Sequence, residues 1–96
     1  MKTTIGNILT MFRQLSGPDM TRVKLSQVLD VTAPFISRVE KDEKKLSDHT
    51  LKRLFEFYQI PVEEFDKIKN AADCLDLSYQ QTYFEVCKVW LKYHPC

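Results

Sequence analysis

The sequence predicts an all-α protein, and three observations support this fold class. Glycine occurs only twice in 96 residues, apolar side chains recur at spacings of three and four, and no segment alternates apolar and polar residues over a strand's length. A chain of this length forms one core of several short helices, without room for a catalytic cleft between two domains. We therefore expect a surface to carry the function.

Three helices are expected in the first 41 residues. The first ends at the segment "SGPD" and has an apolar stripe of Ile5, Ile8, Leu9, Phe12 and Leu15. Thr21 is expected to cap the second, whose inward residues are Val23, Leu25, Val28 and Leu29. After the three-residue turn "DVT", Thr32 is expected to cap a third helix with Ile36 and Val39 inward.

Pro34 marks the beginning of the third helix. The N–H groups of a helix's first turn have no partner within the helix, so a proline there loses no hydrogen bond. Because proline also restricts the preceding Ala33 toward extended angles, the start could shift by one residue. If Thr32 is the cap, its hydroxyl must bond the N–H of Phe35, since Pro34 has none.

Three further helices are expected after the charged segment "KDEKK". Ser47 caps the fourth, with an apolar face of Leu51, Leu54, Phe55 and Tyr58. Pro61 suits the first turn of the fifth, which carries Phe65, Ile68, Ala72 and, at its end, Leu75. Ser78 opens the last, whose stripe is Tyr79, Tyr83, Val86, Trp90 and Tyr93, widened by Phe84, Cys87 and Leu91.

Two short helices joined by three residues, the second of them capped, are the geometry of a helix-turn-helix. The segment from Arg22 to Lys41 resembles the Cro/repressor-like (Xre-type) helix-turn-helix family. The five buried positions of that family hold Leu25, Leu29, Val31, Ile36 and Val39, and Ser26 takes the position where a small residue allows close helix crossing. The resemblance covers Ile5 to Phe65. It implies a five-helix lambda-repressor-like DNA-binding domain at residues 1–65, with residues 66–96 as an added helical extension.

The resemblance implies a recognition helix at about residues 32–41. Its candidate DNA contacts are Thr32, Ala33, Pro34, Phe35, Ser37 and Arg38. The first-turn apolar residues could pack against thymine methyls, while Arg38 could bind guanine O6 and N7. The candidate phosphate contacts are Arg22, Lys24, Lys41, Lys44 and Lys45. The alternatives are an apolar helix tip that docks a protein and a lysine loop that is merely solvated.

Charge and three departures from the family qualify this prediction. The net charge is +1, with a small basic surplus in residues 1–60 and an acidic one in 61–96. Asp30 replaces the usual turn glycine and must tolerate a left-handed conformation. The loop before Arg22 is about two residues longer than usual. The third departure is the apolar first turn of the third helix, formed by Ala33, Pro34 and Phe35.

The resemblance also implies a structural ion pair between Arg13 and Glu40. The alternative is that both side chains are exposed.

The last helix is apolar over more than half its circumference, so we expect it to bury two faces. Because helix-turn-helix proteins usually bind as two-fold dimers, the expected partner is a second copy. The predicted dimerisation residues are Tyr83, Val86, Trp90 and Tyr93. The alternative is that this helix only completes the core of the monomer.

The remaining features argue against other classes of protein. Three cysteines without a CxxC pair, and no signal peptide, indicate a cytoplasmic protein, and no apolar run is long enough for a membrane span. Cys87, His94 and Cys96 lack zinc-site spacing, and His49 has no catalytic partner, so we expect no metal, cofactor or enzymatic activity. The expected function is a homodimeric repressor of phage or bacterial origin that binds a pseudo-palindromic operator. The alternative is a protein-interaction module of antirepressor or antitoxin-like type.

Overall fold

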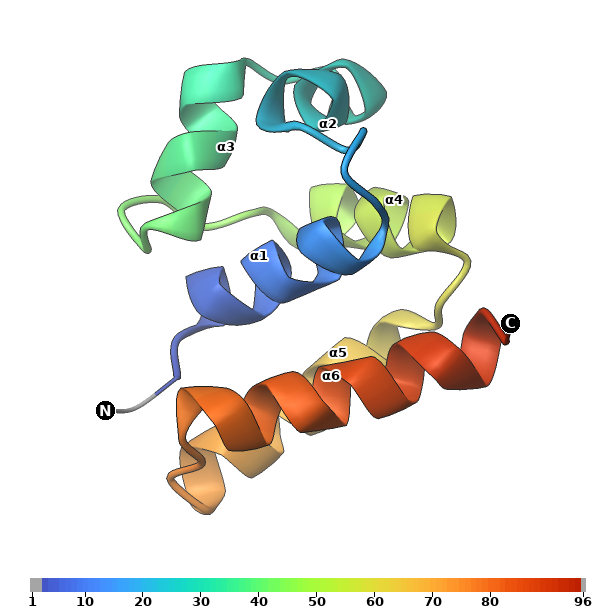
Figure 1. Cartoon of the computed structure of the whole chain (residues 1–96). Coiled ribbons are helices and arrows are strands. Elements are labelled where there is room, and N and C mark those ends of the chain that lie inside the picture. The colour runs from blue at the N-terminus through green and yellow to red at the C-terminus, as the bar shows by residue number, and fades with distance from the viewer. Residues whose placement is uncertain (1–2, 96) are drawn as a thin grey trace.

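The computed structural model describes residues 3–95, which form six helices (Figure 1). They are α1 (Ile5–Leu15), α2 (Arg22–Leu29), α3 (Ala33–Glu40), α4 (Asp48–Tyr58), α5 (Val62–Cys74) and α6 (Tyr79–Tyr93). These residues contain no strand, so the predicted all-α class is confirmed. In Figure 1, α1 lies between the pair α2 and α3 above it and the pair α5 and α6 below it. Helices α3 and α6 both pack against α1, on opposite sides of it.

Side-chain hydroxyls begin five of these helices. In each case a Ser or Thr oxygen accepts the backbone N–H three residues later, which satisfies one of the N–H groups that a helix start leaves unpaired. The predicted caps Thr21, Thr32 and Ser47 do this, and Ser78 forms a capping box with Gln81. Thr4, which was not predicted, caps α1. Pro61 precedes α5 and lies outside its first turn, a shift of one position from the prediction.

The core is centred on aromatic rings from three helices. Phe12, Phe55 and Phe65 are at most 2 % exposed, and the Phe55 ring lies 5.0 Å from Phe12 and 5.3 Å from Phe65. Edge-to-face and tilted ring pairs at this spacing add to the stabilisation that comes from removing apolar surface from water. Tyr58 extends the cluster toward α6, because its ring lies 5.8 Å from that of Trp90. One continuous core therefore holds α1, α4, α5 and α6 together.

Three residues predicted to face inward are exposed instead. Val23 precedes Leu25 by two positions and therefore lies on the opposite side of the short helix α2. Leu75 follows the end of α5, where the chain turns away from the core through Asp76 in a left-handed conformation. Ile5 is 43 % exposed in the first turn of α1, although Ile8, Leu9 and Phe12 of the same stripe are buried.

Helix α6 completes the core of the monomer, and this corrects the predicted dimerisation stripe. Val86 is fully buried, so it cannot face a second copy in this conformation. Tyr83, Trp90 and Tyr93 are half-buried and pack against the core, with the Trp90 ring stacked 4.3 Å from His94. The apolar residues that α6 leaves exposed are Tyr79, Phe84 and Leu91. The helical spacing of the apolar residues in α6 was predicted correctly. The face predicted to contact a second copy, however, is the one that packs against the core of the monomer.

A buried carboxylate joins α5 to α6. Glu64 lies 3.4 Å from the Lys92 ammonium of α6 and 3.5 Å from that of Lys67. Burial raises the pKa of the Glu64 carboxyl, but the hydrogen bonds and charges of Lys92 and Lys67 outweigh it, and the pKa is lower than usual. This contribution to stability is present above the carboxyl's unfolded pKa and is lost as the pH falls through its lowered folded value.

Candidate nucleic-acid interface

The turn between α2 and α3 consists of Asp30, Val31 and Thr32, as predicted. Asp30 ends α2 in a left-handed conformation with φ 57° and ψ 45°. The next N–H, of Val31, donates to the Ser26 carbonyl at 3.0 Å, which satisfies a carbonyl at the end of α2. Ser26 itself is buried and so keeps the crossing with α3 close. Aspartate therefore makes the turn for which the family usually has glycine.

The first turn of α3 is formed as the sequence requires. The Thr32 hydroxyl accepts the Phe35 N–H at 3.2 Å, and Pro34 is the second residue of the helix. Ile36 and Val39 are buried against the rest of the molecule. Helix α3 is thus fixed by its cap and its inward face, while the opposite face remains in solvent.

The predicted base contacts differ in their exposure. Thr32, Pro34 and Arg38 are exposed, whereas Ala33, Phe35 and Ser37 are half-buried, and Phe35 packs partly against the core. The Arg38 side chain makes no hydrogen bond or ion pair within residues 3–95. Arg38 is therefore an exposed side chain of α3 that has no polar partner within these residues.

Glu40, the last residue of α3, binds two arginines. Arg13 of α1 donates from Nε to Glu40 Oε2 at 2.6 Å and from Nη2 to Oε1 at 3.2 Å. The side chains are 15 % and 4 % exposed, so the predicted pair is present and mostly buried. Arg13 Nη1 also donates to the Met20 carbonyl at 3.2 Å, in the long loop before α2. This network fixes the end of α3 to α1 and to that loop.

Arg22, predicted as a phosphate contact, is the second partner of Glu40. Its Nε donates to Glu40 Oε1 at 2.8 Å, while its side chain remains 44 % exposed. The other predicted phosphate contacts are exposed: Lys24, Lys41, Lys44 and Lys45. Arg22 is therefore held in place by the last residue of α3, whereas these lysines make no ion pair within residues 3–95.

The helix-turn-helix family model matches residues 18–65, half of the chain, from the loop before α2 into α5. The chain belongs to this Cro/Xre-type helix-turn-helix family. The predicted resemblance is confirmed, and family membership supports a DNA-binding regulator of a kind that is typically not an enzyme. No curated protein and no solved structure matches the chain.

In this helix-turn-helix protein, the loop after α3 is tied to the start of α1. Asp42, in a left-handed conformation with φ 65°, accepts the Gly6 N–H at 2.8 Å. Gly6 is buried where α1 meets α3, and a Cβ atom added there would lie 2.4 Å from the Glu40 carbonyl oxygen. Asp42 therefore holds the loop after α3 against the start of α1.

The sequence did not predict the roles of Gly6, Asp42 and Arg22 in this arrangement. A glycine inside an otherwise apolar helix was the available signal, because such a residue often marks a close backbone approach.

Cys96 lies outside the described residues, and Cys74 and Cys87 are free thiols. Within residues 3–95, no three His, Cys, Asp or Glu side chains are grouped so that they could hold a metal ion. No helix in this part of the chain is long and apolar enough to cross a membrane. His49 is exposed near the start of α4.

Proposed function

We propose that this protein is a sequence-specific transcriptional repressor that reads a pseudo-palindromic operator through residues 32–41. The observation that carries the proposal is Arg38, an exposed and uncommitted guanidinium on a helix whose end is fixed by Glu40. A planar guanidinium can bind O6 and N7 of one guanine at the same time, which gives sequence discrimination. A rigid helix preserves that discrimination because the arginine needs little reordering on binding.

The apolar first turn of α3 and the surrounding basic residues complete the proposed DNA interface. Pro34 and the exposed part of Phe35 would lie against thymine methyls beside the guanine, with Thr32, Ala33 and Ser37 close to the bases or the backbone. Lys24, Lys41, Lys44 and Lys45 would contact phosphates on either side, and Arg22 would add a contact from a fixed position. Bound at an operator, the protein would repress by occlusion.

Two substitutions separate reading of bases from attraction to phosphates. We expect Arg38→Ala to weaken operator binding by about 1–3 kcal/mol and to relax the preference at one base pair. We expect Lys44→Ala to weaken all sequences alike and to reduce the salt slope by about one. Both are measured by fluorescence anisotropy with operator and scrambled duplexes at two or more salt concentrations.

A matched control for these variants is Lys67→Ala, which removes an exposed lysine on α5, on the side of α1 away from α3. This variant should leave operator affinity unchanged. If Arg38→Ala binds the operator as tightly as the unmodified protein, α3 does not read bases through this residue and the proposed site is wrong.

We also propose that the protein acts as a homodimer, with residues 66–96 contributing the contact. Phe84 and Leu91 support this, because they are 63 % and 55 % exposed on the outer side of α6 and lie two turns apart. A second copy on this face would leave α3 uncovered, since α1 separates the two helices. Two half-sites about 34 Å apart are the spacing expected of a helix-turn-helix dimer.

The two faces of α6 predict opposite results on substitution. Phe84→Glu should give a folded monomer, because a charge on the exposed face disrupts the contact between copies without touching the core. Trp90→Glu should instead lower the melting temperature, because Trp90 packs against Tyr58 and His94 within the monomer. Sedimentation and thermal unfolding of both variants distinguish these effects, and an unaltered sedimentation mass for Phe84→Glu would remove the proposed interface.

A second candidate function is a protein-interaction module built on the same fold. The apolar residues Ala33, Pro34 and Phe35 at the start of α3 favour it, because only part of this turn is buried. An antirepressor or antitoxin-like protein would lose partner binding most strongly on Phe35→Ala, while its response to Arg38→Ala would be small.

A further inference from the structure

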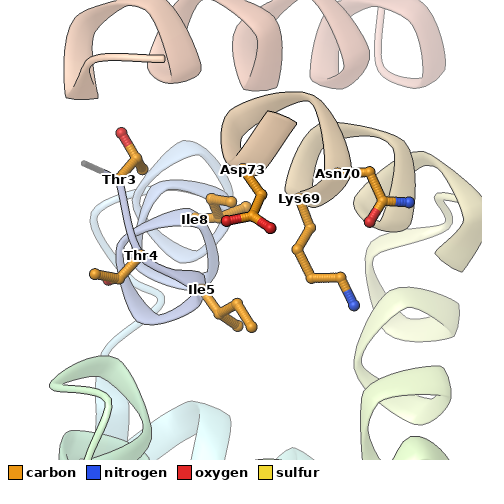
Figure 2. A pocket seen from close by; sticks show the side chains of 7 residues that line it. All are labelled: Thr3, Thr4, Ile5, Ile8, Lys69, Asn70 and Asp73. Carbon is orange, nitrogen blue, oxygen red and sulfur yellow. The ribbon is translucent and has the colours of Figure 1, made fainter. Parts of the chain in front are cut away.

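Two adjoining hollows lie between the start of α1 and helix α5, on the side of α1 that also meets the loop after α3. The first has a volume of about 400 Å³, and Figure 2 shows its lining from Thr3 to Ile8 on one side and from Lys69 to Asp73 on the other. The second has a volume of about 320 Å³ and extends to that loop and the start of α4. Ile5 and Lys69 line both, so the two form one groove, which explains why Ile5 is exposed.

The groove has an apolar floor and a basic edge at one end. Leu9, Val39 and Phe65, each at most 5 % exposed, lie at the floor of the second hollow, and Leu51 is half-buried there. A volume of this size suits a small molecule, and small-molecule sites combine such apolar surfaces with a few polar groups.

Three lysines line the second hollow: Lys44, Lys45 and Lys69. Two carboxylates, Asp42 and Asp48, also line this hollow. Asp42 accepts the Gly6 N–H, and Asp48 is in the first turn of α4, where the helix dipole favours a negative charge. The Lys69 ammonium lies 3.8 Å from Asp66 and 6.0 Å from the centre of the Phe65 ring. The residues that line the second hollow therefore carry a net charge of +1, from three lysines and two aspartates.

We propose that this groove binds an amphipathic organic anion and that the bound anion competes with DNA. Its apolar body would lie on Leu9, Leu51 and Phe65, and its acid group would lie at the three lysines. Two of these, Lys44 and Lys45, are the proposed phosphate contacts, so a bound anion would neutralise charge that DNA requires. The competition rests on the proposed function, whereas the binding of the anion does not.

Calorimetry of the full chain with 4-phenylbutyrate tests the binding alone, with the uncharged 4-phenylbutyramide as the matched ligand. We expect saturable binding of the acid and much weaker binding of the amide. Lys69→Met should lower the affinity for the acid about fivefold, as expected for one partly exposed ion pair. Lys67→Met changes a lysine of the same helix that lies outside the groove, so it should leave the affinity for the acid unchanged. Ile5→Trp, which fills the groove, should abolish binding while the thermal unfolding transition is retained.

Absence of saturable binding, or binding that neither Lys69→Met nor Ile5→Trp changes, would overturn the site. The competition is tested separately by repeating DNA anisotropy with saturating 4-phenylbutyrate, which should weaken DNA binding in the unmodified protein and much less in Ile5→Trp. Binding of the acid without any effect on DNA binding would overturn the competition. If the protein binds no DNA at all, the proposed function fails while the calorimetric result still decides whether the site exists.

Discussion

Replacement of Gly6 by alanine is expected to lower the free energy of unfolding by about 3 kcal/mol, as found when a side chain is forced into a packed site. The added Cβ would lie 2.4 Å from the Glu40 carbonyl oxygen and 2.9 Å from that of Val39. Both are backbone atoms, so no side chain can rotate away, and α1 must separate from the end of α3. Helix propensity alone predicts the opposite sign, a gain of about 1 kcal/mol.

Thermal and urea unfolding measure this effect, and the melting temperature should fall by roughly 15 °C for a domain of this size. Asn7→Ala is the matched control, because it places alanine at the next position of the same helix without a backbone clash. A Gly6→Ala variant as stable as the unmodified protein would mean that α1 and α3 do not approach as closely as described. Loss of DNA affinity at a temperature where the variant remains folded would show that this contact also positions α3.

Replacement of Glu40 by glutamine is expected to cost about 3 kcal/mol of stability, as is typical when one member of a buried ion pair is removed. The amide keeps the size of the side chain but leaves the mostly buried Arg13 without its counter-charge. It also turns N–H groups toward arginine donors that need acceptors. Arg22→Ala should cost only about 1 kcal/mol, because Arg22 is half-exposed and its partner retains Arg13.

The control for this series is Glu43→Gln, an exposed carboxylate three residues further on that should change stability little. Chemical unfolding of the three variants gives the order of effects. Equal losses for Glu40→Gln and Glu43→Gln would show that the Arg13 pair is solvated rather than buried.

Local features of this chain were predictable because they depend on a few neighbouring residues. The caps at Thr21, Thr32 and Ser47, and the left-handed Asp30, follow from the backbone groups that a helix end leaves unpaired. The pair of Arg13 and Glu40 came from the family resemblance, and no spacing rule would have found two residues so far apart in sequence.

The faces of helices were less predictable where tertiary contacts choose between two apolar sides. Helix α6 has apolar residues over more than half its circumference, and the sequence does not say that Val86 turns inward while Phe84 stays outside. The contacts of Gly6 with Glu40 and Asp42 depend on how α1 and α3 pack, which periodicity within either helix does not determine. Arg22 was likewise assigned to DNA alone, because its partner lies on another helix.

The most direct test of the central claim is selection of bound duplexes from a random DNA pool, followed by affinity measurements on the selected sequence at two salt concentrations. We expect an enriched inverted repeat whose half-sites lie about one helical turn apart, with a guanine whose preference is lost in Arg38→Ala. No enrichment, or weak binding that is the same for all sequences, would contradict this function and would direct the search to a protein partner for the first turn of α3.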